Sequence, residues 1–300
     1  MKLTGLHFLL SYQCTFECDH CFVWGSPWQS GTMTLALIDL ALEQACEAGT
    51  IDWIYFEGGE PFLYYPVMLK GIAKAREMGL HIGIVTNSYW ATAEEDALEW
   101  LRPLAGQVED LSISSDLFHY EDNTSQQTRN ASQAAEKLGI PIGVISIAQP
   151  CEAVEGHPTG QLPSGTSRVM YRGRAAEKLI QDATLQPWSQ FTECPEEDLL
   201  EPGRVHLDPL GHLHICQGIT IGNIYQSTLK EVCAAYNPYS HPILGALLAG
   251  GPAELVRRYD LPHQEGYADA CHLCYQSRRL LRSQFASLLT PDQMYGVNIQ

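Results

Sequence analysis

The chain up to residue 148 alternates short apolar runs with longer amphipathic stretches. Five runs rich in branched or aromatic residues have the length of buried strands, at 3–12, 51–58, 80–87, 109–116 and 141–148. Four stretches between them carry apolar residues at helical spacing, at 33–49, 67–79, 92–104 and 125–139. Three of these predicted helices end at a glycine, Gly49, Gly79 or Gly139, which suits the left-handed residue that commonly closes a helix.

This alternation predicts an α/β fold in which helices cover a parallel sheet. In such folds, ligand-binding residues gather where strands end and loops begin. Polar motifs that directly follow a predicted strand are therefore candidates for the functional site.

The pattern changes after residue 148. Residues 149–166 are dense in Gly, Pro, Ser and Thr, which predicts a loop that could lie over the site. A short hairpin is predicted next, because RVHL and HLHI flank the turn sequence DPLG at 208–211. Helical stretches follow at 227–236 and 242–251, and a last helix is predicted beside a pair of cysteines from residue 271.

Composition and charge narrow the class of protein. The 300 residues are 45% hydrophobic, enough to bury a substantial core. The formal net charge of −17 argues against nucleic acid or an anionic membrane as a partner. The sequence shows no signal peptide and no apolar segment of membrane-spanning length, so a cytoplasmic protein is expected.

The chain has ten cysteines. Reducing cytoplasm disfavours structural disulfides, so metal ligation or catalysis is the better interpretation. Seven of the cysteines form two groups, one near the start and one toward the end: Cys14, Cys18 and Cys21, then Cys194, Cys216, Cys271 and Cys274.

The first group follows the first predicted strand with the spacing C-x3-C-x2-C. Three thiolates favour a soft metal or a cluster, whereas a structural zinc ion needs a closed set of four ligands. A cubic iron–sulfur cluster held by three cysteines leaves one iron open to another ligand. A zinc ribbon that uses Cys18 and Cys21 with His20 or Cys14 is the alternative, but it leaves the motif at residues 58–61 unexplained.

These motifs together resemble the signature of the radical S-adenosylmethionine (SAM) superfamily. The sequence GGEP, Gly58, Gly59, Glu60 and Pro61, ends the second predicted strand. In the family the open iron of a [4Fe–4S] cluster binds SAM, and the backbone and glutamate of GGEP hold its methionine ammonium. Two glycines let the main chain approach a ligand closely, and a carboxylate suits an ammonium.

Further matches follow in the order that the family has them. Thr86 and Asn87 end the third predicted strand, where the family often has a Thr-Asn pair near SAM. Ser114 and Asp116 end the fourth, at positions that commonly reach the SAM ribose. The fifth strand is the expected wall for adenine. The family usually has an aromatic residue before the third cysteine, and here His20 takes that place with a ring that can still pack near adenine.

The resemblance implies a partial (β/α)6 barrel of TIM type at residues 1–185. The second cysteine group, placed after a hairpin and ending in C-x2-C, resembles the SPASM and shorter twitch domains of radical SAM enzymes. It implies a small domain at 186–300 with one auxiliary [4Fe–4S] cluster. A zinc ion in the same four sulfurs is the alternative.

Cys151, in the predicted loop, and Cys233, in a predicted helix, stand apart from both groups. In related radical enzymes a free cysteine sometimes donates a hydrogen atom to the substrate radical, so both are candidate catalytic residues. Otherwise they are core or surface thiols. His206, His212 and His214 share one face of the predicted hairpin, where they could line the substrate, support the cluster or form an ordinary polar face.

The predicted function is that of a radical SAM enzyme. Such an enzyme reductively cleaves SAM to a 5′-deoxyadenosyl radical, which abstracts hydrogen from an unactivated C–H bond, and a reducing partner such as flavodoxin or ferredoxin is implied. A peptide is the preferred substrate, through crosslinking, epimerisation or oxidation, because SPASM and twitch domains often accompany peptide maturation. A small metabolite is the alternative substrate. A non-catalytic iron–sulfur or zinc protein is the alternative of another class.

Overall fold

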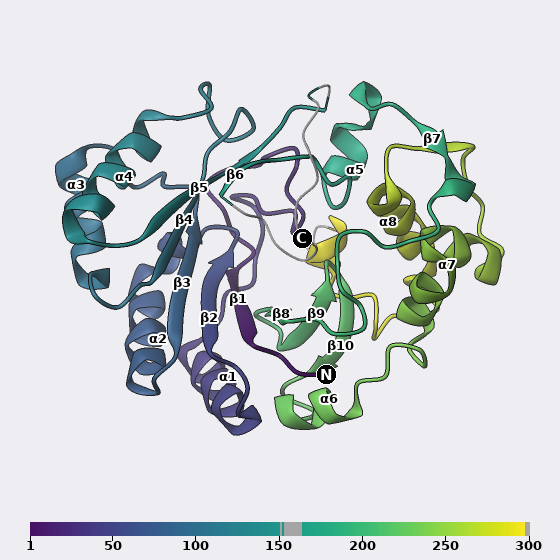
Figure 1. Cartoon of the computed structure of the whole chain (residues 1–300), viewed down its shortest axis with the longest axis horizontal. Coiled ribbons are helices and arrows are strands. Elements are labelled where there is room, and N and C mark those ends of the chain that lie inside the picture. Colours follow the sequence, from purple (N-terminus) through teal and green to yellow (C-terminus); the bar gives the residue numbers. More distant parts are fainter. Residues whose placement is uncertain (151, 153–163, 298–300) are drawn as a thin grey trace.

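A computed structural model describes residues 1–150, 152 and 164–297. Within these residues the centre is a nine-stranded sheet with the order β10-β9-β8-β1-β2-β3-β4-β5-β6. Strands β1 to β6 are parallel and lie in chain order, and helices α1 to α4 cover the outer face of the curved sheet (Figure 1). The predicted α/β fold with its partial (β/α)6 barrel is confirmed. The bounds are β1 Gly5–Ser11, α1 Leu35–Ala48, β2 Trp53–Gly58, α2 Tyr65–Glu77, β3 His81–Thr86, α3 Glu94–Leu101, β4 Asp110–Ser114, α4 Gln126–Leu138, β5 Ile142–Ile147 and β6 Gly165–Ser167.

The helix ends follow from the local sequence. The hydroxyl of Thr34 accepts the N–H of Leu37 at 3.2 Å and caps the start of α1. Gly49 ends α1 at a φ of 71°, and Gly139 ends α4 at a φ of 66°. The glycine stops expected at these positions are therefore confirmed.

Side chains of the parallel strands alternate between two faces. In β2, Ile54 and Phe56 are fully buried in the core beneath the helices. Trp53, Tyr55 and Glu57, at the intervening positions, line a cavity on the inner face. The period of two along a strand thus separates a core face from a cavity face.

Residues beyond the barrel extend the same sheet. β8 (Arg204–Leu207) pairs parallel with β1, and β9 (His212–Cys216) and β10 (Ile219–Asn223) continue the sheet with antiparallel pairing. β8 and β9 form the hairpin expected around 208–211, which is confirmed. The sheet crosses the predicted division at residue 185, and that division stays a prediction.

A helical layer completes the fold beside β10, on the right of Figure 1. Its helices α7 and α8 pack against each other and enclose a second hydrophobic core. None of the helices in the described part of the chain combines the length and hydropathy that a membrane span requires. The remaining elements are α5 Ala175–Lys178, β7 Gln186–Pro187, α6 Leu229–Ala235, α7 Pro242–Tyr259, β11 Gly266–Tyr267, α8 Ala270–Leu281, and the 3-10 helices η1 Pro61–Tyr64, η2 Arg102–Leu104, η3 Ile180–Asp182, η4 Trp188–Gln190 and η5 Asp292–Tyr295.

Candidate active site

A cavity of about 620 Å³ lies on the inner face of the parallel strands. This volume is within the range of about 300–1,000 Å³ that small-molecule sites occupy. Ile145 and Ile147 of β5 form part of its wall, on the strand expected to face adenine. The predicted cluster ligands, and the residues predicted from the family motifs to contact SAM, that line it are Cys14, Cys18, Cys21, Gly58, Gly59, Thr86, Asn87, Ser114 and Asp116.

The first three cysteines lie on the loop that follows β1. The backbone N–H of Phe16 donates to Sγ of Cys14 at 3.4 Å, and the N–H of Gly25 donates to Sγ of Cys21 at 3.2 Å. Burial raises the pKa of the Cys14 thiol to about 12, and burial together with the neighbouring Cys21 also raises the pKa of Cys18. Because thiolates are the metal ligands, these buried groups need a bound cation or cluster to ionise.

The spacing of the cysteine sulfurs can be compared with that of a single zinc site. A zinc ion with Zn–S bonds of about 2.3 Å holds its sulfurs about 3.8 Å apart. Within the described residues, the sets of three ligand atoms that all lie within 4.8 Å of one another contain histidines and carboxylates but no cysteine. In neither cysteine group, therefore, do three sulfurs all lie within 4.8 Å of one another.

Gly58 and Gly59 bring the end of β2 against the cysteine loop. The N–H of Gly59 donates to the carbonyl of Ser11 at 2.6 Å. A Cβ on Gly59 would lie 2.1 Å from the carbonyl oxygen of Gln13, and one on Gly58, where φ is 128°, would lie 2.6 Å from that of Ser11. Side chains are excluded at both positions, so the cavity wall here is bare backbone.

The other two residues of the GGEP motif, Glu60 and Pro61, do not line the cavity. The carboxylate of Glu60 is fully buried and accepts the N–H of Phe62 at 3.0 Å, the N–H of Asn87 at 2.9 Å and the hydroxyl of Thr86 at 2.8 Å. Burial raises the pKa of Glu60 to about 7. Glu60 thus fixes the turn after β3, and its predicted contact with the SAM ammonium stays a prediction.

Asn87 connects that turn to the cysteine loop. Its side-chain Nδ2 lies 3.5 Å from Sγ of Cys14 and donates to the hydroxyl of Thr15 at 3.1 Å. The hydroxyl of Tyr120 donates to the Asn87 carbonyl at 2.7 Å and fixes the backbone. An amide donor beside a ligating sulfur is the kind of outer contact that orients and tunes a metal centre.

Ser114 and Asp116 reach the cavity from the end of β4 and the turn after it. The Asp116 carboxylate accepts the Nδ1 of His119 at 2.8 Å and the N–H of Ile147 at 3.0 Å, with Nε2 of His20 at 3.5 Å. Although burial opposes ionisation, hydrogen bonds from His119 and His20 lower the pKa of Asp116. Asp116 therefore holds His20 and β5 in place, and the contacts of Ser114 and Asp116 with the SAM ribose stay predictions.

Arg174 fixes the cysteine loop from a distant part of the chain. Its guanidinium donates to the carbonyl of Cys18 at 2.6 Å and to the carbonyl of Gly25 at 2.8 Å, and only 2% of the residue is exposed. At the neighbouring Gly173, with a φ of 60°, a Cβ would lie 2.5 Å from the carbonyl oxygen of Cys21. Sequence reasoning missed both residues, because only the fold brings them to the loop.

The second cysteine group lines a second cavity between α7, α8 and β9: Cys194, Cys216, Cys271 and Cys274. Burial raises the pKa of Cys194, Cys271 and Cys274. Arg172 and Arg278 also line this cavity. Arg172 donates to Sγ of Cys216 at 3.3 Å and to Glu197 at 3.2 Å. The structure thus brings all four sulfurs and two buried cations together.

Arg278 is buried and, unlike Arg172, has no carboxylate partner among the described residues. Only 1% of it is exposed, and it donates to the carbonyl of Gln217 and, at 3.3 Å, to the hydroxyl of Tyr295. A buried guanidinium requires a negative charge nearby, and thiolates at Cys216 and Cys274 would supply it.

Of the two candidate hydrogen donors, only Cys233 can be placed in the fold, because Cys151 lies outside the described residues. Cys233 is half-buried on α6, which packs against α1 on the helix side of the sheet, and it lines neither cavity. The catalytic roles of both cysteines stay predictions.

Two of the three hairpin histidines form a structural network. His212 and His214 bind Asp208 at 3.2 and 3.1 Å, and Tyr12 donates to the same carboxylate at 3.0 Å. His206 instead lines the cavity together with His7, Glu57 and other polar residues of β1, β2 and β4. The sequence reading missed His7 and Glu57, although polar residues at alternate positions of an apolar strand could have indicated them.

Residues 8–147 match the family model described as Radical SAM superfamily. The matched region includes the cysteine and GGEP motifs, so the resemblance to this superfamily is confirmed over these residues. Domains of this superfamily bind a [4Fe–4S] cluster and SAM.

Individual proteins show more distant similarity. A protein of Bacillus subtilis (strain 168) named "Putative peptide biosynthesis protein YydG" is 26% identical over 129 residues, which are 43% of this chain and 40% of that protein. BtrN in complex with AdoMet and 2-DOIA superposes with a TM-score of 0.51 and 15% identity, covering 77% of this chain and 82% of that chain. Native anSMEcpe with bound AdoMet and Cp18Cys peptide gives a TM-score of 0.47 at 12% identity, over 95% and 97% of the two chains. The likeness to BtrN shows a shared fold.

Proposed function

We propose that this chain is a radical SAM enzyme that removes a hydrogen atom from an unactivated C–H bond of a peptide. The observation that carries the proposal is the convergence of three strand ends on one cavity. Cys14, Cys18 and Cys21 follow β1, the bare backbone of Gly58 and Gly59 ends β2, and Asn87 follows β3 with its amide toward a cysteine sulfur.

Cys14, Cys18 and Cys21 would hold a [4Fe–4S] cluster whose fourth iron binds SAM. When reduced by a flavodoxin or ferredoxin, such a cluster would supply the one electron that cleaves the C5′–S bond of SAM to methionine and a 5′-deoxyadenosyl radical, the species that would abstract hydrogen from the substrate. Residues at the ends of β2 to β4 would position SAM, and Ile145 and Ile147 of β5, which line the cavity, would shield its adenine from water.

A peptide substrate is supported by the name of the Bacillus subtilis relative, which refers to peptide biosynthesis. The similarity covers less than half of either chain, so it supports the substrate class and not a particular peptide. A small metabolite is the alternative substrate class.

The second cysteine group would hold one auxiliary [4Fe–4S] cluster. The support is that all four cysteines line one cavity together with the two buried arginines beside them. A fully ligated cluster carries net negative charge, which Arg172 and Arg278 would offset. A zinc ion in the same four sulfurs is the alternative.

Anaerobic reconstitution tests the activity. The cluster-loaded chain is reduced with dithionite in the presence of SAM, and 5′-deoxyadenosine is measured by chromatography. Wild type is expected to release it, and the variant with Cys14, Cys18 and Cys21 all changed to Ala is not. Intact SAM in the wild-type reaction, with the cluster shown to be present and reduced by electron paramagnetic resonance (EPR), would overturn the proposal.

Deuterium transfer tests the substrate class. One reaction contains a pool of fully deuterated peptides and a second contains a deuterated extract of small metabolites. Deuterium in 5′-deoxyadenosine from the peptide pool alone supports a peptide substrate, whereas deuterium from the extract alone reverses the assignment.

Counting iron and sulfide tests the auxiliary cluster. Two clusters give about eight irons and eight sulfides per chain, and one cluster gives about four of each. Changing Cys194, Cys216, Cys271 and Cys274 to Ser should remove half of the iron. Bound zinc at these residues in a chain loaded anaerobically with iron and sulfide would contradict the assignment.

A further inference from the structure

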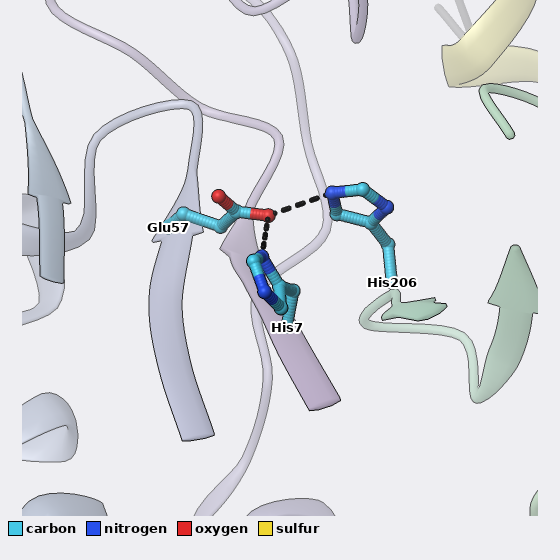
Figure 2. Close-up of side chains that lie close together, drawn as sticks. All are labelled: His7, Glu57 and His206. Atoms are coloured by element: carbon cyan, nitrogen blue, oxygen red, sulfur yellow. Dashed lines mark hydrogen bonds and ion pairs between the residues drawn. The ribbon is translucent and has the colours of Figure 1, made fainter. Parts of the chain in front are cut away.

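Three side chains from three strands converge on the inner face of the sheet: His7 of β1, Glu57 of β2 and His206 of β8 (Figure 2). Oε1 of Glu57 lies 3.2 Å from Nδ1 of His7 and 2.9 Å from Nε2 of His206. These three ligand atoms all lie within 4.8 Å of one another. The side chains are 16%, 13% and 11% exposed, and all three line the cavity, so the group is shielded on the sheet side and reachable from the cavity.

The neighbouring rings hold the two imidazoles in place. His7 pairs in register with His206 of β8 and with Tyr55 of β2, and the ring of Tyr55 stacks on His7 at 4.5 Å. The ring of Phe22 lies 5.9 Å from that of His206. The group is therefore built from rigid strands and packed aromatic rings, as a preorganised binding site is.

The carboxylate of Glu57 differs from the two other carboxylates that lie beside histidine pairs. Asp116 accepts backbone N–H groups of Phe118 and Ile147, and Asp208 accepts the hydroxyl of Tyr12 and two backbone N–H groups. Among the described residues, Glu57 has only the two imidazoles as polar partners, both on Oε1. A carboxylate offers about four acceptor positions, so the Glu57 carboxylate has acceptor capacity left for a cation.

The ligand types and spacing match a divalent transition metal. Two imidazoles and one carboxylate form a ligand set of open zinc sites and of non-haem iron sites. Bonds of about 2.0–2.2 Å at tetrahedral angles place neighbouring ligand atoms about 3.3–3.6 Å apart. The observed separations of 2.9 and 3.2 Å need to widen by only a few tenths of an ångström.

We propose that His7 Nδ1, the Glu57 carboxylate and His206 Nε2 bind one divalent transition-metal ion of the zinc type, with a coordination position open to the cavity. The imidazole protons then sit on Nε2 of His7 and Nδ1 of His206. The open position takes a water molecule or an oxygen of a bound carboxylate or carbonyl group. This binding does not depend on radical chemistry, so it can be tested apart from the proposed function.

Zinc binding is measured on the full chain with its iron–sulfur clusters already loaded, which keeps the cysteines occupied. After dialysis against metal-free buffer the protein is titrated with Zn²⁺, and bound zinc is counted by mass spectrometry. Wild type is expected to bind about one zinc ion per chain, and Glu57→Gln or His206→Ala to lose at least about four-fifths of it. His212→Ala is the matched control, because it removes a histidine beside another carboxylate, and it should keep its zinc.

X-ray absorption at the zinc edge identifies the ligands in the wild type, so the test does not depend on the variants folding. Nitrogen and oxygen neighbours at about 2.0–2.1 Å with an imidazole signature are expected. Sulfur neighbours at about 2.3 Å would place the metal on cysteines and overturn the proposal. Equal zinc in Glu57→Gln and wild type, or no zinc in wild type, would also overturn it and leave a purely hydrogen-bonded group.

Discussion

The side-chain amide of Asn87 lies 3.5 Å from Sγ of Cys14 and joins the end of β3 to the loop that follows β1. The backbone of Asn87 is in turn held by the buried carboxylate of Glu60, at 2.9 Å. Glu60 belongs to the motif at the end of β2, so one carboxylate connects three strand ends around the cysteine loop. Through Asn87, the glutamate of GGEP acts on the cysteines without lining the cavity itself.

Asn87→Ala should lower the reduction potential of the first cluster. The amide dipole stabilises negative charge on the sulfur of Cys14, and that charge increases on reduction. We expect a negative shift on the order of tens of millivolts, measured by EPR-monitored redox titration without SAM. Asn223→Ala is the control, because its amide binds the carbonyl of Leu210, far along the chain from the cysteine loop. Equal potentials in the two variants would refute the role of Asn87.

Glu60→Gln should change how stability depends on pH. Burial raises the pKa of Glu60 from 4.5 to about 7 in the folded chain. As pH rises, the Glu60 carboxyl therefore ionises in the unfolded chain before it does so in the folded chain, which favours unfolding. Between pH 5 and 8, the free energy of unfolding of the wild type should therefore fall by up to about 3 kcal/mol relative to that of Glu60→Gln. The variant also loses a hydrogen-bond acceptor, which adds a difference that does not change with pH. Anaerobic urea unfolding of both proteins across this range measures the difference. A difference that stays constant with pH, as expected for the exposed control Glu47→Gln, would contradict the prediction.

Gly59→Ala should prevent the cysteine loop from packing against the end of β2. The added Cβ would lie 2.1 Å from the carbonyl oxygen of Gln13, which is backbone and cannot rotate away. Iron and sulfide retained after anaerobic reconstitution should fall to less than about one-fifth of wild type. Gly79→Ala serves as control, because its Cβ meets no atom within 4 Å and its φ of 80° costs only about 1–2 kcal/mol. Full cluster loading in Gly59→Ala would show that the close approach is not required.

The sequence predicted those parts of the site whose residues are close together in the chain. The cysteine spacing and GGEP are local patterns at the ends of strongly periodic strands, so both their positions and their convergence followed from the βα alternation. Arg174 is separated from Cys18 by 156 residues, and no local pattern distinguishes it from a surface arginine. For Glu60 the sequence placed the residue but not the direction of its carboxylate, which depends on donors supplied by the turn after β3.

The cavity face of the strands was only partly predictable. The apolar runs identified the strands, but a period of two assigns residues to faces without saying which face is the core. The helices cover the face with Ile54 and Phe56, which leaves His7 and Glu57 on the inner side. His206 joins them because β8 pairs with β1, a pairing between strands that lie about 200 residues apart and that propensity does not reveal.

Arg174→Lys should make the first cluster easier to lose. The guanidinium bridges the carbonyls of Cys18 and Gly25 with two nitrogens, and a lysine can reach only one of them. Loss of one charged hydrogen bond in a buried site costs about 1.5–3 kcal/mol, so iron release to a chelator should accelerate at least about tenfold. Release is followed by the loss of cluster absorbance. Arg102→Lys changes an exposed arginine that pairs with Glu99, and it should release iron at the wild-type rate. Equal rates of iron release in the two variants would exclude a role of Arg174 in retaining the cluster.

Arg278→Met tests whether the buried charge of Arg278 acts on the proposed auxiliary cluster. Arg278 lies beside Cys274 and Cys216, and within the described residues it has no carboxylate partner, so its charge would stabilise the proposed auxiliary cluster in its reduced state. Removing it should shift the reduction potential of that cluster to a more negative value, by on the order of tens of millivolts, or release the cluster and halve the iron. Arg279→Met is the matched control, because the next arginine points outward and pairs with Glu177. EPR-monitored titration and an iron count distinguish the two variants. If both keep the same iron and the same potential, the charge of Arg278 does not act on a cluster, and the auxiliary site loses its electrostatic support.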